Sequence, residues 1–269
     1  MNATRRFGLY IVGDEILSGK RQDQHFEKLR AIMSARGLAL SWVIYLGDDR
    51  AHCVRMFKES FASGDVVFCC GGIGSTPDDH TRQAAAEALN LPLMLHPQAE
   101  QLIRMRAAET NQLATDDRLR MGEFPEGAAI IPNPYNRIAG FSIREHYFVP
   151  GFPVMAWPML EWVLDSYYQD QFRRIAEFDR SMIVLQLFEA AVTPLMNQLI
   201  EKYPQLKIYS LPSAGENGLP RHLELGFKAA AEHRDQTDAP AMLIAAYEEL
   251  KQGVLALGGK ITEERQAAR

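Results

Sequence analysis

The chain has 269 residues, of which 47% are hydrophobic and 23% are charged, and its formal net charge is −5 at pH 7. This composition is typical of a globular protein and excludes a disordered or fibrous chain, while the acidic balance gives nucleic acid and anionic lipid no overall attraction. Its three cysteines form no disulfide framework, and no apolar stretch reaches the roughly 18 residues of a membrane span, so we expect a cytoplasmic protein that acts away from membranes.

Short apolar runs alternate with segments of helical periodicity in the first half of the chain. Apolar runs rich in β-forming residues indicate strands, and apolar residues that repeat on one face indicate helices. This alternation predicts right-handed crossovers and a mostly parallel sheet. The expected elements, in chain order, are a strand at 7–12, a helix at 22–36, a strand at 38–46, a helix at 51–62, a strand at 65–70 and a helix at 79–89.

A polar helical segment at 97–121 interrupts this pattern, and we expect it to be an insertion packed beside the sheet. Strands at 128–131, 141–143 and 147–149 and a closing helix at 153–168 follow. We therefore expect the strands after the insertion to belong to the first domain.

The charged stretch 169–180 marks the expected domain boundary. Beyond it the pattern is that of a small α+β domain with an antiparallel strand pair. Its expected elements are a strand at 182–188, a helix at 192–203, strands at 206–211 and 222–227, and a helix at 239–257. We therefore expect a first domain over 1–170, a second over 171–262, and a frayed polar tail over 263–269.

A glycine-rich loop follows the strand at 65–70 and carries the most chemical information. Its glycines let the backbone approach a ligand closely, and successive amides there form a nest for an anion, reinforced by the next helix. Thr76 is expected to cap that helix, with Pro77 at its first position and Asp79 completing a capping box. An ordinary strand-to-helix turn, in which Asp78 and Asp79 complement the helix dipole, accounts for the same residues.

Acidic residues follow three successive strands. They are Asp14 and Glu15 after the first strand, Asp48 and Asp49 after the second, and the aspartates of the glycine loop after the third. Because ligands of open α/β sheets bind beyond the carboxyl ends of the strands, we expect these groups to share one edge. Carboxylates repel a phosphate unless a divalent cation such as Mg²⁺ lies between them, and Lys20 or Arg21 could add a positive contact.

These stretches carry a resemblance to the MoaB/Mog family of molybdopterin-binding domains, and most closely to its CinA-like (competence-damage-inducible) branch. The matching stretches are Gly13-Asp14-Glu15-Ile16-Leu17-Ser18-Gly19-Lys20, Gly47-Asp48-Asp49, the loop Gly71–Thr81, Met121–Ala129, Pro132-Asn133-Pro134 and Val149-Pro150-Gly151-Phe152-Pro153. They occur in the family order over about residues 7–165.

The resemblance implies an α/β three-layer sandwich that often forms homo-oligomers. In molybdenum-cofactor enzymes this domain binds molybdopterin, and some members adenylylate it with Mg-ATP. CinA-type domains are associated with metal-dependent cleavage of ADP-ribose, so a pyrophosphatase is one expectation. Residues beyond 165 resemble the small middle domain of CinA proteins, and we expect no C-terminal deamidase domain.

Three overlapping sets of residues are expected to form the site. Asp49, Asp78 and Asp79 are the candidate catalytic residues, and Asp14, Asp78 and Asp79 are the candidate metal ligands. The ligand, a pterin or an adenine nucleotide, is expected to contact Gly13, Asp14, Glu15, Lys20, Gly71, Gly72, Gly74, Ser75, Thr76 and Thr81.

The sequence departs from the family pattern at several positions. Ser75 stands where proline is usual, His80 where an aliphatic residue is usual, and His25 where asparagine is usual. The segment 136–140 reads Asn-Arg-Ile-Ala-Gly instead of Gly-Thr-Ala-Pro-Gly. Because that segment normally helps line the pocket, a catalytically silent binding or assembly module is a second hypothesis.

Gly215-Glu216-Asn217-Gly218 has the G-x-x-G pattern of RNA-binding KH domains. The stretch contains Asn-Gly, which is a hairpin signal, and an acidic residue that phosphate would repel. We therefore expect a turn between two strands, and no nucleic-acid partner.

Overall fold

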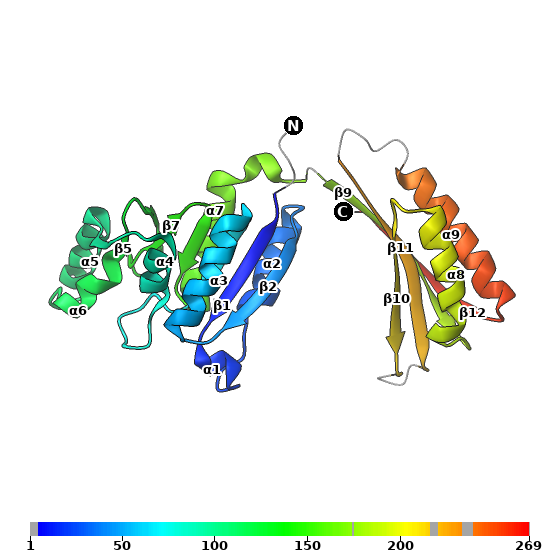
Figure 1. Ribbon diagram of the computed structural model, residues 1–269, viewed down its shortest axis with the longest axis horizontal. Coiled ribbons are helices and arrows are strands. Elements are labelled where there is room, and N and C mark those ends of the chain that lie inside the picture. Colours follow the sequence, from blue (N-terminus) through cyan, green and yellow to red (C-terminus); the bar gives the residue numbers. More distant parts are fainter. Residues whose placement is uncertain (1–4, 174, 216–219, 233–238, 269) are drawn as a thin grey trace. The chain divides into compact units, whose positions relative to one another are not determined.

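The computed structural model describes residues 5–173, 175–215, 220–232 and 239–268. The chain divides into two compact units, 1–172 and 173–269, which are described separately (Figure 1). This division falls within the charged stretch that the sequence analysis took as the boundary. In the described residues, no helix is both long enough and apolar enough to cross a membrane.

The first unit is built on a six-stranded sheet of order β2-β1-β3-β8-β7-β6. Strands β2, β1, β3 and β8 are parallel to one another, and the last two strands pair antiparallel. The sheet is therefore mostly parallel, as the alternation of strands and helices predicted. The strands are β1 (Phe7–Val12), β2 (Leu40–Leu46), β3 (Val66–Cys70), β6 (Ala129–Ile131), β7 (Gly140–Ile143) and β8 (His146–Val149).

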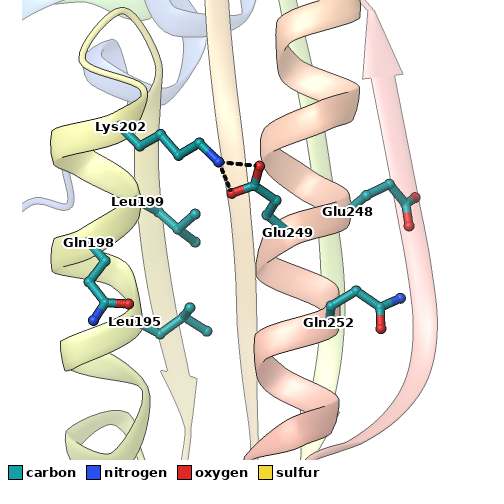
Figure 2. Close-up of a pocket in the computed structure, with 7 residues that line it drawn as sticks. All are labelled: Leu195, Gln198, Leu199, Lys202, Glu248, Glu249 and Gln252. Atoms are coloured by element: carbon teal, nitrogen blue, oxygen red, sulfur yellow. Dashed lines mark hydrogen bonds and ion pairs between the residues drawn. The ribbon is translucent and has the colours of Figure 1, made fainter.

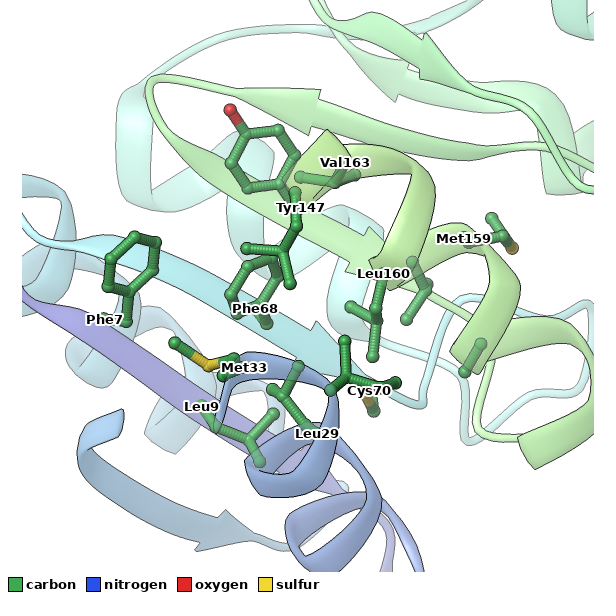
Figure 3. Packing of buried hydrophobic residues seen from close by; sticks show 14 of the residues in the cluster. Phe7, Leu9, Leu29, Met33, Phe68, Cys70, Tyr147, Met159, Leu160 and Val163 are labelled. Atoms are coloured by element: carbon green, nitrogen blue, oxygen red, sulfur yellow. The ribbon is translucent and has the colours of Figure 1, made fainter. Parts of the chain in front are cut away.

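Helices cover both faces of this sheet and make a three-layer sandwich. One core joins the sheet to α2 (His25–Ala35) and α7 (Pro153–Tyr167), and the other joins it to α3 (Arg50–Ser63) and α4 (Thr81–Leu89). Strand β1 contributes to both cores because its side chains alternate between the two faces of the sheet, with Leu9 in the first core and Tyr10 in the second. Figure 3 shows the first core.

The segment 90–128 is an insertion with its own two-stranded sheet. Strands β4 (Leu93–Leu95) and β5 (Glu123–Pro125) pair antiparallel and bracket two helices, α5 (Pro97–Glu109) and α6 (Asp116–Leu119), and a 3₁₀ turn at Arg120–Gly122. The sequence pattern predicted one helical segment over 97–121; the structure has two helices and a 3₁₀ turn there.

The start of α4 differs from the expected capping box. The helix begins at Thr81, and no side chain caps it. Residues 76–79 instead form a β-turn in which the Asp79 N–H donates to the Thr76 carbonyl oxygen at 3.0 Å, with Pro77 at the position that proline favours. The predicted helix start at Asp79 and the predicted cap at Thr76 are therefore wrong.

The second unit is a four-stranded antiparallel sheet of order β10-β11-β9-β12, with α8 (Glu189–Lys202) and α9 (Ala239–Ala256) packed on its apolar side chains. The strands are β9 (Ile175–Leu185), β10 (Lys207–Ser213), β11 (His222–Glu232) and β12 (Lys260–Ala268). The expectation of a frayed tail from 263 is wrong, because Glu263–Ala268 pair with β9. The G-x-x-G stretch lies between the antiparallel strands β10 and β11, but residues 216–218 lie outside the described part of the chain.

A buried histidine in the first unit predicts acid sensitivity. His146 is 1% exposed and lies against Phe61, with Nδ1 3.0 Å from the Arg144 carbonyl oxygen and Nε2 2.8 Å from Ser60 Oγ. Burial lowers its pKa from 6.5 to about 4, against the smaller opposing effects of the Arg144 carbonyl and Asp65. The folded state therefore requires the neutral imidazole.

The unfolding free energy is expected to fall by about 3 kcal/mol as the pH drops from the unfolded pKa of His146 to its folded value. In that pH range His146 is protonated in the unfolded chain but neutral in the folded chain. The full unfolding free energy is therefore reached only above about pH 6.5. Urea unfolding between pH 4 and 8 measures the effect. His146→Gln should flatten this part of the profile, whereas the exposed His52→Gln should not; equal profiles for the two variants would refute the assignment.

Candidate ligand-binding site

The carboxyl ends of the parallel strands meet at one edge of the first sheet, and the loops that follow them are in contact. The Gly13 N–H donates to the Leu46 carbonyl oxygen at 2.9 Å, which joins the loops after β1 and β2. The Gly71 N–H donates to the Val149 carbonyl oxygen at 3.0 Å, which joins the ends of β3 and β8. The edge is therefore one continuous surface.

Carboxylates from three loops converge at this edge. The Asp14 N–H donates to Asp48 Oδ2 at 2.9 Å, and the Asp48 N–H donates to Asp14 Oδ1 at 3.3 Å. Burial raises the pKa of the Asp48 carboxyl above its ordinary value; the hydrogen bond from Asp14 opposes this, and the negative charges of Asp14, Glu15 and Asp78 add to it. The charges on three segments, 13–15, 47–49 and 71–81, are therefore close enough to affect one another.

Asp49 and Asp79 each stabilise the backbone of their own loop through a hydrogen bond. Asp49 Oδ1 accepts a hydrogen bond from the His52 N–H at 2.6 Å and caps α3. Asp79 Oδ2 accepts from the Thr76 N–H at 2.8 Å and from its hydroxyl at 2.5 Å, which fixes the turn of the glycine loop. The carboxylates of Asp49 and Asp79 therefore stabilise the backbone of the loops at this edge.

Asp48 is the acidic residue that the sequence analysis did not select. Its neighbour Asp49 immediately precedes α3 and takes the capping position, which leaves Asp48 to face Asp14. The order of residues before a helix could have revealed this, because only one of two adjacent aspartates can be the cap.

The glycine loop presents unpaired backbone donors. Gly71 and Gly72 have φ values of +109° and +69°, and the Thr81 N–H donates to the Gly72 carbonyl oxygen at 3.0 Å, which closes the loop. No described residue accepts a hydrogen bond from the amides of residues 72–75. Consecutive free amides in a loop of this kind form an anion nest.

The other expected contact residues divide by exposure. Ser75 and Lys20 are exposed at this edge, where a ligand could reach them. Thr81 is 1% exposed, and its hydroxyl, which has no hydrogen-bond partner among the described residues, occupies the place that a Cβ on Gly72 would need. Thr81 therefore supports the loop from within.

A cavity of about 240 Å³ adjoins the acidic edge and includes Glu15, Arg21, His25 and Gly151 in its wall. His25 is 4% exposed, and its Nε2 lies 3.1 Å from the Gly151 carbonyl oxygen, so this nitrogen carries the proton. Burial lowers the pKa of His25, which favours the neutral ring. The cavity is close to the lower limit of small-molecule sites, roughly 300 Å³.

A larger groove of about 450 Å³ lies between α8 and α9 of the second unit. Figure 2 shows that Lys202 and Glu249 face each other across it, with the ammonium 2.6 and 2.8 Å from the two carboxylate oxygens. Lys202 and Glu249 satisfy each other, and Glu248, which also lines the groove, lies 3.7 Å from Arg180, so each of these charged groups already has a partner.

The altered segment 136–140 does not bring a new cation to the acidic edge. Arg137 has a φ of +65°, and its guanidinium lies 3.0 Å from a carboxylate oxygen of Glu109 on α5. The buried Asn133 amide donates to Asn136 Oδ1 at 2.8 Å and to the Ile138 carbonyl oxygen at 2.9 Å. The segment is thus a locally bonded turn.

Comparison with known proteins agrees with this fold. The sequence profile of a family described as "Probable molybdopterin binding domain" matches residues 8–170. A protein of Aeropyrum pernix is 26% identical over 263 residues, covering 96% of this chain and 97% of its own length. A CinA-like protein of Sulfurihydrogenibium is 28% identical over 185 residues; the match covers 66% of this chain and only 46% of that protein.

Among solved structures, CinA from Thermoplasma acidophilum superposes with a TM-score of 0.54 and 22% identity. The match covers 60% of this chain and 98% of that one. At this identity the likeness concerns the fold alone.

Proposed function

Because the chain belongs to this family of molybdopterin-binding domains, we propose that its first unit binds a phosphate-bearing pterin of the molybdopterin type at the acidic edge. The observation that carries the proposal is that the loop with the free amides of residues 72–75 also carries Asp78, whose negative charge acts on Asp48, the hydrogen-bonding partner of Asp14. Amides attract a phosphate and carboxylates attract a cation, so the two together suit a phosphate that arrives with a divalent metal.

The glycine loop binds the phosphate in this proposal. Its free amides are the donors, and the exposed hydroxyl of Ser75 is within the same loop. The loop is closely packed at this point, since even a Cβ on Gly74 would lie 2.5 Å from Asp79 Oδ2. The pterin ring system would extend toward the adjoining cavity, beside Glu15 and His25.

A divalent cation fits the carboxylates as a bridge. Among the described residues, no three His, Cys, Asp or Glu side chains gather as a ready-made metal site. Mg²⁺ does not need such a group, because it is commonly held by one or two carboxylates together with phosphate oxygens and water. Asp14 and Asp78 would hold it, and the cation would offset the charge that these residues and Asp48 place beside the phosphate.

Thermal unfolding with and without a molybdopterin-type pterin phosphate tests the proposal, because a ligand that binds only the folded state raises Tm. The wild-type chain should show a rise that requires Mg²⁺. Asp78→Asn removes one charge at the edge and should abolish most of the rise. Asp116→Asn, on the exposed first turn of α6, is the matched control and should keep it.

Two results would decide against parts of the proposal. An unchanged Tm with pterin phosphate and Mg²⁺ would reject the ligand class, and a rise that Asp78→Asn preserves would reject this edge as the site. The same samples, incubated with ADP-ribose or ATP and Mg²⁺, Mn²⁺ or Co²⁺, separate a pyrophosphatase from a silent binding module: turnover that depends on the metal and is lost in Asp78→Asn supports catalysis.

A further inference from the structure

A buried cation lies directly behind the glycine loop. Arg82 is only 3% exposed although it belongs to the first turn of α4. Its guanidinium donates to the Gly74 carbonyl oxygen at 2.7 Å and to the Arg120 carbonyl oxygen. The same side chain therefore connects the loop to the 3₁₀ turn before β5.

This guanidinium has no adequate counter-charge in the described part of the chain. Its hydrogen bonds are to carbonyl oxygens, its Nε–H is buried without any partner, and Asp79 and Glu123 act on it only at longer range. Burying a charge without a paired opposite charge is unfavourable. An anion bound in the loop would provide the missing negative charge.

The bond to Gly74 also fixes the direction of the next amide. None of the peptide bonds in the described residues is cis, and in a trans peptide the C=O and the following N–H point in opposite directions. Because Arg82 holds the Gly74 oxygen on its own side, the Ser75 N–H must point away from the guanidinium. Ser75, the residue that carries this amide, is exposed.

We propose that Arg82 is a positioning residue for anion binding: it orients the Gly74–Ser75 peptide so that the Ser75 N–H meets a phosphate or pyrophosphate group, and it supplies the positive charge behind it. The guanidinium polarises this peptide, which makes the Ser75 amide a better donor. This inference rests on the proposed function, since it assumes that the loop binds a phosphate group. It adds a residue that acts through the backbone and does not touch the ligand.

The test is isothermal titration of the full chain with inorganic pyrophosphate in the presence of Mg²⁺. Arg82→Met keeps an unbranched apolar stem but removes the charge and the hydrogen-bond donors, and its affinity should fall about tenfold or more. Arg82→Lys keeps the charge but has a shorter reach and lacks the planar fork of the guanidinium, and it should recover only part of the loss. The control is Arg104→Met, the same substitution at an exposed position of α5, which should bind like wild type.

The ¹⁵N–¹H signal of the Ser75 amide gives a second readout that a purely structural role would not move. In wild type this signal should shift strongly on addition of pyrophosphate, and in Arg82→Lys the response should be much smaller in a folded protein. If Arg82→Met does not fold, the lysine variant carries the test alone.

The titrations distinguish a failure of the positioning role of Arg82 from a failure of phosphate binding at the loop. Binding by wild type with unchanged affinity and unchanged Ser75 response in the Arg82 variants would overturn this inference and leave the proposed function standing. No binding of pyrophosphate by wild type would overturn both.

Discussion

Replacing Gly71 by alanine is expected to lower the unfolding free energy by about 3 kcal/mol or more. At its φ of +109°, an added Cβ would lie 2.2 Å from the carbonyl oxygen of Val12 and 3.2 Å from its carbonyl carbon. Both atoms belong to the backbone of β1, so neither can rotate away as a side chain would. Urea unfolding of the variant measures the loss, and the acidic edge should be disrupted together with the fold.

Gly64→Ala is the matched control for this prediction. Gly64 also has a positive φ, +76°, at the end of α3, but an added Cβ would meet nothing within 4 Å. Its loss should be limited to the left-handed backbone strain of about 1–2 kcal/mol. Equal losses of stability in the two alanine variants would contradict the claim that close packing of Gly71 on the β1 backbone stabilises the fold.

Asp48→Asn is expected to have opposite effects on stability and on binding. The folded state raises the pKa of this carboxyl, first by burial and then by neighbouring negative charges. Ionised Asp48 therefore destabilises the folded chain above that pKa, and the penalty disappears as the pH falls through it. The neutral variant should gain up to about 1 kcal/mol at pH 7, since solvent screens a partly exposed group, while Asn Oδ1 can still accept from the Asp14 N–H.

Binding should move the other way, because the same charge attracts the cation that accompanies the phosphate. The affinity for pyrophosphate with Mg²⁺ should fall about tenfold, whereas Asp116→Asn should change neither quantity. Urea unfolding and titration calorimetry on the same preparations give both numbers. A variant that became less stable at pH 7, or that bound as tightly as wild type, would show that the carboxylates do not form one charged site.

The parts of the fold that could be predicted from sequence are those in which burial dictates periodicity. Strands β1 and β3 are buried along their whole length, so their apolar runs located the sheet and the edge where its loops converge. Strand β12 was missed because most of its side chains are polar and exposed, and an edge strand of this kind has no apolar alternation to reveal it.

The details of the site were harder to predict because several residues could serve two purposes. Thr76 and Asp79 have the spacing of a capping box, but they form a turn one step before the helix. Arg82 could not be distinguished from a surface arginine, since only the folded chain brings the carbonyls of Gly74 and Arg120 to its guanidinium. Polar contacts between distant segments are the part that sequence periodicity does not encode.

The central claim is that the free amides of residues 72–75 and the carboxylates of Asp14, Asp48 and Asp78 form one cation-bridged phosphate site. Titration calorimetry of the wild-type chain with inorganic pyrophosphate, with and without Mg²⁺, tests it most directly. The account predicts saturable binding that is at least about tenfold tighter with Mg²⁺ than without it. Binding that is absent under both conditions, or equally tight without the metal, would contradict it.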